Sequence, residues 1–235
     1  MEKEKITFDH LDVYIGLNSE YPEVHNVCRH SIDTRSSVKT VFHEIGTSVL
    51  PDEIWWRQTN DMETTEFSLC RFLVPWLNHN KGYAVYMDDD FLWQGDIAEM
   101  MELVDPTKAV HVVKHKYSPK TEIKQNGNKQ TNYKMKNWSS LMVFNCSHPD
   151  LLKLKPMIVN NKSGMYLHQF KWTNPFNIGT LPIHFNFLVG EYEYKPQLDI
   201  RAYHFTLGGP WLDECKTQDF ADKWIDEKRN LDSCR

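Results

Sequence analysis

The sequence predicts an α/β fold with a mixed, mainly parallel sheet flanked by helices. Apolar runs of strand length alternate with amphipathic segments through the first half of the chain, which is typical of strands joined by helices. The chain has 235 residues, of which 40% are hydrophobic and 13% aromatic, enough to bury a substantial core. It contains no internal repeat and no clear linker, so we expect residues 1–235 to form one domain.

The expected elements follow one another in strand–helix order. The expected strands are residues 11–17, 38–45, 82–87, 109–115, 139–146 and 200–203. The expected helices are residues 23–32, 64–77, 97–104, 148–158 and 219–229. Pro75 should bend or end the second helix, because proline lacks the N–H group that a helix interior uses. Residues 116–137 are polar and predict a long loop, which is either a lid over a site or an ordinary surface loop.

The composition argues against several classes of protein. The net charge is −5 and no long basic run occurs, so no nucleic-acid partner is expected. The N-terminus lacks an apolar signal segment, and no stretch reaches the roughly 18 apolar residues of a transmembrane helix. The odd cysteine count, without a CxxC pair, predicts reduced, mostly structural thiols in a cytoplasmic protein. These cysteines are Cys28, Cys70, Cys146, Cys215 and Cys234.

Three consecutive aspartates, Asp88, Asp89 and Asp90, directly follow the apolar strand 82–87. Ligands of open α/β sheets bind beyond the carboxyl ends of the strands. Side chains alternate along an extended chain, so Asp88 and Asp90 would face one ion, and carboxylates suit a hard cation such as Mg²⁺ or Mn²⁺. The alternative is a charged turn after a strand, a common fate of acidic residues.

The segment YAVYMDDDFLWQGDI resembles the strand–Asp-x-Asp–strand signature of GT-A glycosyltransferases. It is most similar to glycosyltransferase family 8, which includes glycogenin and bacterial galactosyltransferases. The resemblance implies a GT-A fold and a metal-dependent transfer of a hexose from a UDP-sugar, of the UDP-glucose or UDP-galactose type, with retention of configuration. It implies Mn²⁺ (or Mg²⁺) as the cofactor, held by Asp88 and Asp90, with Asp89 facing the nucleotide.

Two segments resemble the part of this family that binds the nucleotide. DVYIGLNSEYPEVHNVCRHSI is similar to the opening strand and helix, where Gly16 and Asn18 match positions that face the nucleotide. TTEFSLCRFLVP resembles the helix before the aspartates, and its Arg71 matches an arginine that the family aims at the donor. A guanidinium suits this task because it can donate two parallel bonds to a phosphate. Taken alone, Gly16 is an ordinary strand-end glycine, whereas Arg71 is as readily a surface arginine on a helix as a donor-binding one.

The segment HFTLGGPW, residues 204–211, resembles the family's C-terminal HxxGxxKPW motif. The resemblance implies that His204 is the third protein ligand of the metal. The segment is shorter than the motif, and Gly209 stands where the family has the lysine that grips the pyrophosphate. The backbone of Gly208 and Gly209 could take over this contact, because glycine lets a backbone approach a phosphate closely. A lysine of the long loop, Lys134 or Lys136, is the other replacement.

Three further segments resemble the sugar-binding part of the family. NWSSLMVFN and LPIHFNFLVGEY match two strand-like motifs, which would place Trp138, Ser139 and Ser140 beside the donor sugar. YLHQFKW matches a helix start that offers Asp-Gln to the sugar, but this chain has His168 and Gln169 there. The resemblance makes Gln169 a candidate catalytic residue beside Asp88 and Asp90.

No residue of the sequence stands out as a catalytic nucleophile. Gln169 is a poor nucleophile, and Asp199 lies in no recognisable motif. A same-face attack, in which the leaving phosphate takes the proton of the acceptor, fits the residues better than a double displacement. The acceptor would be a glycan or a small molecule.

Two other functions remain open at this point. A metal-dependent phosphoesterase would also use clustered aspartates, although two-metal sites usually draw carboxylates from several strands. A non-catalytic module that binds a nucleotide or a glycan is the second alternative, because the lysine before Pro-Trp is missing.

Overall fold

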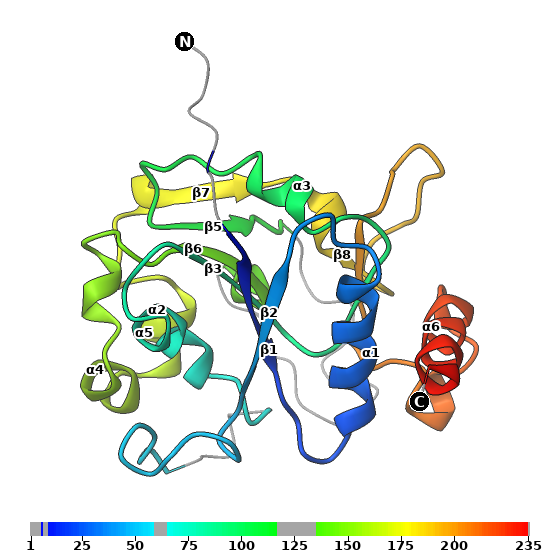
Figure 1. The fold of residues 1–235 in the computed structure, drawn as a ribbon, viewed down its shortest axis with the longest axis horizontal. Coiled ribbons are helices and arrows are strands. Elements are labelled where there is room, and N and C mark those ends of the chain that lie inside the picture. The colour runs from blue at the N-terminus through cyan, green and yellow to red at the C-terminus, as the bar shows by residue number, and fades with distance from the viewer. Residues whose placement is uncertain (1–5, 7–8, 59–64, 117–134, 235) are drawn as a thin grey trace.

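The computed structural model describes residues 6, 9–58, 65–116 and 135–234. Within this part a six-stranded sheet has the strand order β2-β1-β3-β6-β5-β7, and a three-stranded sheet has the order β4-β9-β8. Figure 1 shows the larger sheet crossing the middle of the molecule. The strands are β1 (Leu11–Gly16), β2 (Thr40–Ile45), β3 (Tyr83–Met87), β4 (Phe91–Trp93), β5 (Val110–Val113), β6 (Leu141–Asn145), β7 (Ile178–Leu181), β8 (Phe187–Leu188) and β9 (Ala202–His204).

Helices cover both faces of the larger sheet. In Figure 1, α2, α4 and α5 lie to one side of it and α1 to the other. Each face has its own core, because side chains alternate along a strand: Tyr86 belongs to one cluster, and its neighbours Val85 and Met87 to the other.

The α-helices are α1 (Pro22–Asp33), α2 (Val74–Leu77), α3 (Ala98–Met101), α4 (Pro156–Asn161), α5 (Gly164–His168) and α6 (Ala221–Ser233). The 3₁₀ helices are η1 (Cys70–Leu73), η2 (Trp138–Ser140), η3 (Leu151–Lys153), η4 (Pro175–Asn177), η5 (Ile183–Phe185) and η6 (Asp213–Cys215).

The order and direction of the strands bring three chain segments to one edge. Strands β1 and β3 are parallel and neighbours, so their carboxyl ends, at Gly16 and Met87, meet at this edge. Strand β6 runs antiparallel to β3 and pairs Leu141 with Met87. The residues just before β6 therefore arrive where β3 ends. The larger sheet is thus mixed: β1–β2, β1–β3 and β5–β7 are parallel, and both neighbours of β6 are antiparallel to it.

The small sheet brings a fourth segment to the same edge. Strand β4 begins directly after Asp90 and pairs antiparallel with β9, so that Phe91 lies opposite His204. The backbone N–H of Phe205 also donates to the carbonyl of Asp90 at 3.0 Å. These contacts fix His204 beside the aspartates, although it lies more than a hundred positions later in the chain.

The expected helices 64–77 and 148–158 are wrong in their extent. The first is a short 3₁₀ turn, η1, followed by one turn of α2, and Pro75 lies at the start of α2. The second is η3 followed by α4, which Pro156 begins. Proline is tolerated in a first helical turn, where its missing N–H group has no partner in any case. Both prolines therefore begin helices here.

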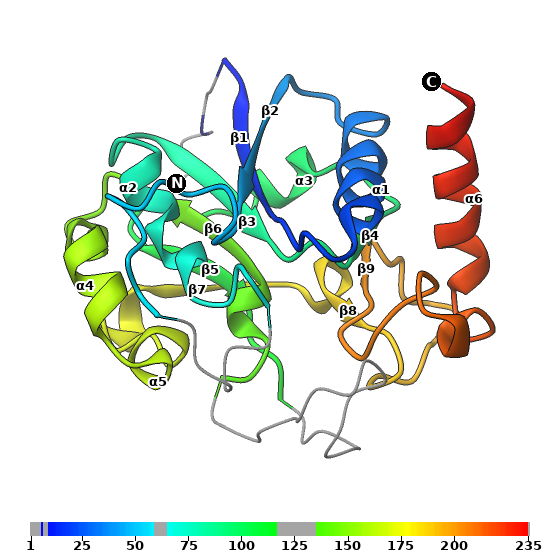
Figure 2. The same ribbon diagram turned by 90° about the horizontal axis from the view of Figure 1, so that it is seen from below.

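The C-terminal helix packs beside α1, as Figure 2 shows. Its Glu227 is 3% exposed, and the carboxylate receives two bonds from the Arg35 guanidinium, at 2.6 and 3.1 Å. His30 Nδ1 lies 2.7 Å from the same carboxylate. None of the five cysteines, all of which lie in the described part of the chain, forms a disulfide; four are buried and Cys234 is exposed. Among the described residues, no helix is both long and apolar enough to cross a membrane.

Candidate active site

Asp88, Asp90 and His204 come together at the carboxyl end of β3. One ligand atom from each lies within 4.8 Å of the others, and Nε2 of His204 is 3.2 Å from Oδ1 of Asp90. Asp88 is anchored by its backbone N–H, which donates to the carbonyl of Ser140 at 2.9 Å. Two carboxylates and an imidazole are a donor set that suits Mn²⁺ or Mg²⁺. The residues therefore fit the metal that the sequence predicted.

A buried arginine lies against this cluster. Nη1 of Arg71 is 2.6 Å from Oδ1 of Asp88, and the Arg71 side chain is only 6% exposed. Two backbone carbonyls fix the guanidinium, that of Phe67 at 3.2 Å from Nε and that of Ser139 at 2.9 Å from Nη1. The hydroxyl of Tyr86 donates to the same oxygen of Asp88 at 2.7 Å. The predicted donor-binding arginine thus contacts a predicted metal ligand directly.

Opposing effects act on the Asp88 carboxyl. Burial raises its pKa, and the nearby charge of Asp90 raises it further. The positive charge of Arg71 and the Tyr86 hydrogen bond oppose this rise by favouring the charged form. The cluster is therefore acidic, with its excess negative charge only partly balanced by a fixed cation.

Asp89 lies beside the chain that follows β1, where the backbone of Asn18 contacts its carboxyl group. It is 6% exposed, and burial raises its pKa well above the usual range, with the charges of Asp90 and Asp88 adding to the rise. The backbone N–H groups of Asp89 itself and of Asn18 act in the opposite direction. The side chain of Asn18 accepts the backbone N–H of Glu20 at 3.2 Å. Asp89 and Asn18 are thus neighbours, as their shared assignment to the nucleotide requires.

Gly16 is required by packing as well as by its place at the end of β1. A Cβ atom on this residue would lie 2.7 Å from the Phe67 ring, too close for a rigid aromatic neighbour. Its carbonyl oxygen is 3.0 Å from Nδ1 of His25, a buried residue of α1. Phe67 and His25 therefore hold this end of the strand in place.

The loop after β9 is shaped by its two glycines. Gly208 has a φ of 119°, which favours glycine, and its N–H donates to the carbonyl of Phe205 at 2.9 Å. This N–H is thus used inside the turn. A Cβ on Gly209 would lie 2.1 Å from the Trp211 ring. Of the two candidate lysines, Lys136 is 8% exposed, and Lys134 lies outside the described residues, as does most of the predicted lid.

The predicted sugar-binding residues lie near Arg71, which donates to the carbonyl of Ser139. The hydroxyl of Ser139 is 2.8 Å from Nδ1 of His168, at the end of α5, and Gln169 follows as the C-cap of that helix. Burial and the neighbouring charge of Arg71 lower the pKa of His168 to about 3. His168 is therefore neutral at physiological pH. Trp138 donates from Nε1 to the carbonyl of His115 at 3.0 Å.

Asp199 lies apart from this group. Its side chain is 78% exposed and is 3.4 Å from Nη2 of Arg201. It stands on the surface and is no candidate nucleophile.

Two residues of the site were missed in the sequence. Tyr86 lies two positions before Asp88, so strand alternation alone would have placed both side chains on the same side. Asn186 is fully buried and contacts both His204 and Ser140. Its only sequence signal is a polar residue between two phenylalanines, which is a weak one.

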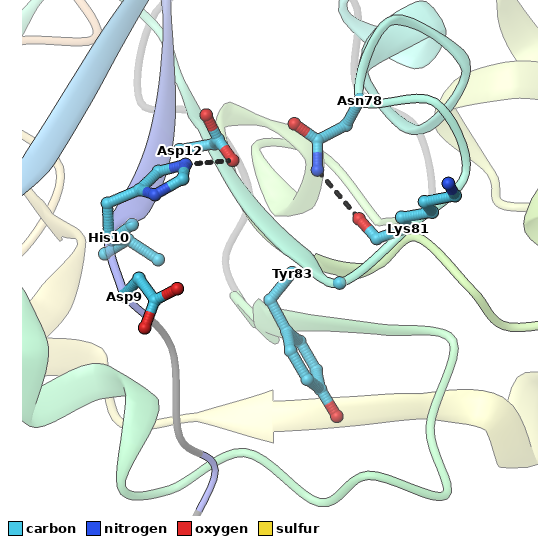
Figure 3. Close-up of a pocket in the computed structure, with 8 residues that line it drawn as sticks. Asp9, His10, Asp12, Asn78, Lys81 and Tyr83 are labelled. Carbon is cyan, nitrogen blue, oxygen red and sulfur yellow. Dashed lines mark hydrogen bonds and ion pairs between the residues drawn. The ribbon is translucent and has the colours of Figure 1, made fainter.

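A small pocket lies at the opposite end of the central strands (Figure 3). It has a volume of about 190 Å³ and is lined by residues before and at the start of β1 and β3, among them Asp12 and Tyr83. Asp12 is in contact with His10 and His43, at 3.4 and 2.8 Å. This pocket lies at the amino ends of β1 and β3, whereas the aspartates lie at the carboxyl end of β3. The two sites are therefore separated by the length of the strands.

Comparison with known proteins identifies one related sequence and several solved structures of similar fold. No protein-family model matches the chain. Protein CDI of Arabidopsis thaliana is 40% identical over 219 residues, which cover 92% of this chain and 85% of that protein. Solved structures of glycosyltransferases are similar over nearly the whole chain at much lower identity.

Three of these structures illustrate the likeness. The bifunctional glycosyltransferase WbbM has a TM-score of 0.66 at 15% identity, covering 97% of this chain and 51% of its own. GlyE of Streptococcus pneumoniae TIGR4 has a TM-score of 0.62 at 10% identity, covering 94% and 60%. The galactosyltransferase LgtC, in complex with donor and acceptor sugar analogs, has a TM-score of 0.59 at 12% identity, covering 94% and 96%. The chain thus spans about half of WbbM but nearly all of LgtC. The predicted GT-A fold is confirmed.

Proposed function

The chain belongs to the same family as Protein CDI of Arabidopsis thaliana and has the GT-A fold, and from this starting point we propose that it is a metal-dependent glycosyltransferase. It would move a hexose from a UDP-sugar, of the UDP-glucose or UDP-galactose type, to a glycan or small-molecule acceptor. The observation that carries this proposal is the convergence of Asp88, Asp90 and His204 from two different sheets, beside the buried cation of Arg71.

The donor would lie across the carboxyl ends of β1 and β3. Asp88, Asp90 and His204 would hold Mn²⁺ or Mg²⁺, whose chemistry is to neutralise the charge that develops on the leaving diphosphate. Arg71 adds a fixed positive charge that needs no reorganisation during the reaction, because two carbonyls and Asp88 already orient it. Asp89 and Asn18 would bind the nucleoside, with the Asp89 carboxylate toward the ribose.

The sugar would lie toward η2 and α5. Ser139 and His168 share a hydrogen bond, and the neutral imidazole of His168 can donate or accept without adding charge. Gln169, Ser140 and Trp138 complete the proposed sugar side. We propose retention: the bond from the anomeric carbon to the phosphate breaks, the acceptor oxygen bonds on the same face, and its proton passes to the leaving phosphate oxygen.

The test is turnover with purified protein. We expect release of UDP from at least one of a panel of nucleotide sugars in the presence of Mn²⁺. Asp90→Asn should abolish the release, whereas Asp213→Asn, at a 91% exposed side chain on the surface, should leave it unchanged. An inverted anomeric configuration in the product would contradict the same-face mechanism and leave the transferase proposal intact.

A second candidate is a non-catalytic module that binds a nucleotide or a glycan. It is favoured by Gly209, which stands where the family motif has a lysine and which is packed so closely against Trp211 that a side chain has no room. Tight binding of UDP, with no turnover of any donor in the panel, would support this reading over the transferase.

A further inference from the structure

The buried side-chain amide of Asn186 contacts the ring of His204 at Nδ1. Asn186 is 0% exposed, and its Oδ1 lies 2.8 Å from Nδ1 of His204. The other ring nitrogen, Nε2, faces Asp90 in the acidic cluster. We propose that Asn186 is a positioning residue, which keeps a proton on Nδ1 of His204 and so presents Nε2 to a divalent cation. This inference rests on the proposed metal site of the transferase.

The hydrogen bonds around Asn186 determine which way its amide faces. The hydroxyl of Ser140 donates to the backbone carbonyl of Asn137 at 2.7 Å, and a carbonyl can only accept. Ser140 Oγ must therefore accept in its second bond, which joins it to Asn186 at 2.9 Å. The amide nitrogen thus faces Ser140, and the amide oxygen faces His204.

This orientation of the amide determines which ring nitrogen of His204 carries the proton. An amide oxygen only accepts, so Nδ1 of His204 must carry the proton in their shared bond. In a neutral imidazole the lone pair is then on Nε2, the nitrogen turned toward Asp90. A metal-binding histidine is commonly oriented in this way by a partner on its other nitrogen.

Two neighbours limit the remaining freedom of the ring. Phe91 stacks on His204 with ring centres 4.4 Å apart and planes 18° from parallel, which sets the plane of the imidazole. Ser140 acts on both sides of the cluster, because its carbonyl accepts the backbone N–H of Asp88 while its hydroxyl orients Asn186. Ser140 thereby links Asp88, at the end of the larger sheet, to His204 of the smaller one through Asn186.

The test measures Mn²⁺ binding rather than activity. Free Mn²⁺ is followed by electron paramagnetic resonance in titrations of the protein, with and without UDP. Asn186→Leu, similar in shape but without hydrogen bonds, should weaken Mn²⁺ binding about 10- to 100-fold. Asn186→Asp keeps an acceptor for the Nδ1 proton and should restore binding to within a few-fold of the wild type, which a purely structural role would not predict.

A second buried asparagine provides the matched control. Asn160 is 7% exposed and bonds to the backbone of Ile54, Trp56 and Arg57, away from the site. Asn160→Leu should lower the free energy of unfolding and leave Mn²⁺ binding unchanged. If Asn186→Leu does not fold, Ser140→Ala removes only the hydroxyl that orients the amide and should weaken Mn²⁺ binding several-fold.

The outcomes separate this inference from the proposed function. A wild-type protein that releases UDP from a sugar donor, with an Asn186→Leu variant that binds Mn²⁺ equally tightly, would overturn the inference alone. The same holds if Asn186→Asp binds as weakly as Asn186→Leu. A wild-type protein that binds no Mn²⁺, with or without UDP, would overturn both.

Discussion

Arg71 and Asp88 form an ion pair at the heart of the candidate site, with Nη1 of the arginine 2.6 Å from Oδ1 of the aspartate. The arginine side chain is 6% exposed and the aspartate side chain 16%. Burial makes such a pair costly to break from one side, because the remaining charge is left without compensation. The pair is therefore important for stability, in addition to the donor contact that we propose for Arg71.

Arg71→Met should destabilise the protein by about 3 kcal/mol, because it leaves the Asp88 charge uncompensated. Arg71→Lys should recover part of this loss, since it keeps the charge but cannot reproduce the bonds to both Phe67 and Ser139. Urea unfolding measures both changes. Arg229→Met provides the control, because its ion pair with Asp226 is exposed and should contribute less than about 1 kcal/mol. Equal losses at positions 71 and 229 would contradict the role of burial.

The pKa of His168 predicts an acid-sensitive stability. This pKa is lowered from 6.5 to about 3 in the folded protein, so below pH 6.5 the unfolded chain binds a proton that the folded protein does not. The stability contributed by neutral His168 is present above pH 6.5 and is lost as the pH falls toward 3. Between pH 7 and pH 5 the loss amounts to about 2 kcal/mol. His168→Gln should remove this part of the pH dependence in urea unfolding at the two pH values. An unchanged slope would show that His168 is protonated in the folded protein.

Glu227 should anchor the C-terminal helix to α1. Glu227→Leu would remove the carboxylate that accepts two charge-assisted bonds from Arg35, and we expect a loss of about 2 kcal/mol in the free energy of unfolding. Faster proteolysis of α6 should accompany it, because the contact between α6 and α1 is weakened. Asp226→Leu, at the neighbouring exposed position, should change both measurements little. Equal unfolding free energies and equal proteolysis rates for the two variants would show that the contact between Glu227 and Arg35 does not anchor the helix.

Gly209→Ala should destabilise the protein by about 1 to 3 kcal/mol, because its Cβ would meet the rigid Trp211 ring at 2.1 Å. Gly164→Ala is the matched control: its Cβ would lie at an ordinary 3.5 Å from Leu69, in the first turn of α5. Thermal unfolding of both variants checks the difference. A Gly209→Ala variant as stable as the wild type would show that Trp211 can move aside, and that room for a lysine exists after all.

Several features of this protein were predictable because they depend on local pattern. The apolar runs predicted most strands to within a few residues, and their alternation with helices predicted the fold class. Asp88, Asp90 and His204 were selected from motif order, and the fold places them together. The short strands β4, β7 and β8 were not predicted. Proline was another source of error, because this residue type can end one helix and begin another. Only the neighbouring turns determine which of the two occurs.

The sequence by itself determined the residue types at the candidate site: the alternating carboxylates after a buried strand, the histidine of the C-terminal motif, and the missing lysine. Tertiary structure decided their partners. The pairing of β4 with β9 brings His204 to Asp90, and the antiparallel β6 brings Ser139 and Ser140 beside Asp88. These contacts join residues far apart in the chain. Their hydrogen bonds and pKa values depend on burial and distance, which arise only when the two sheets pack together.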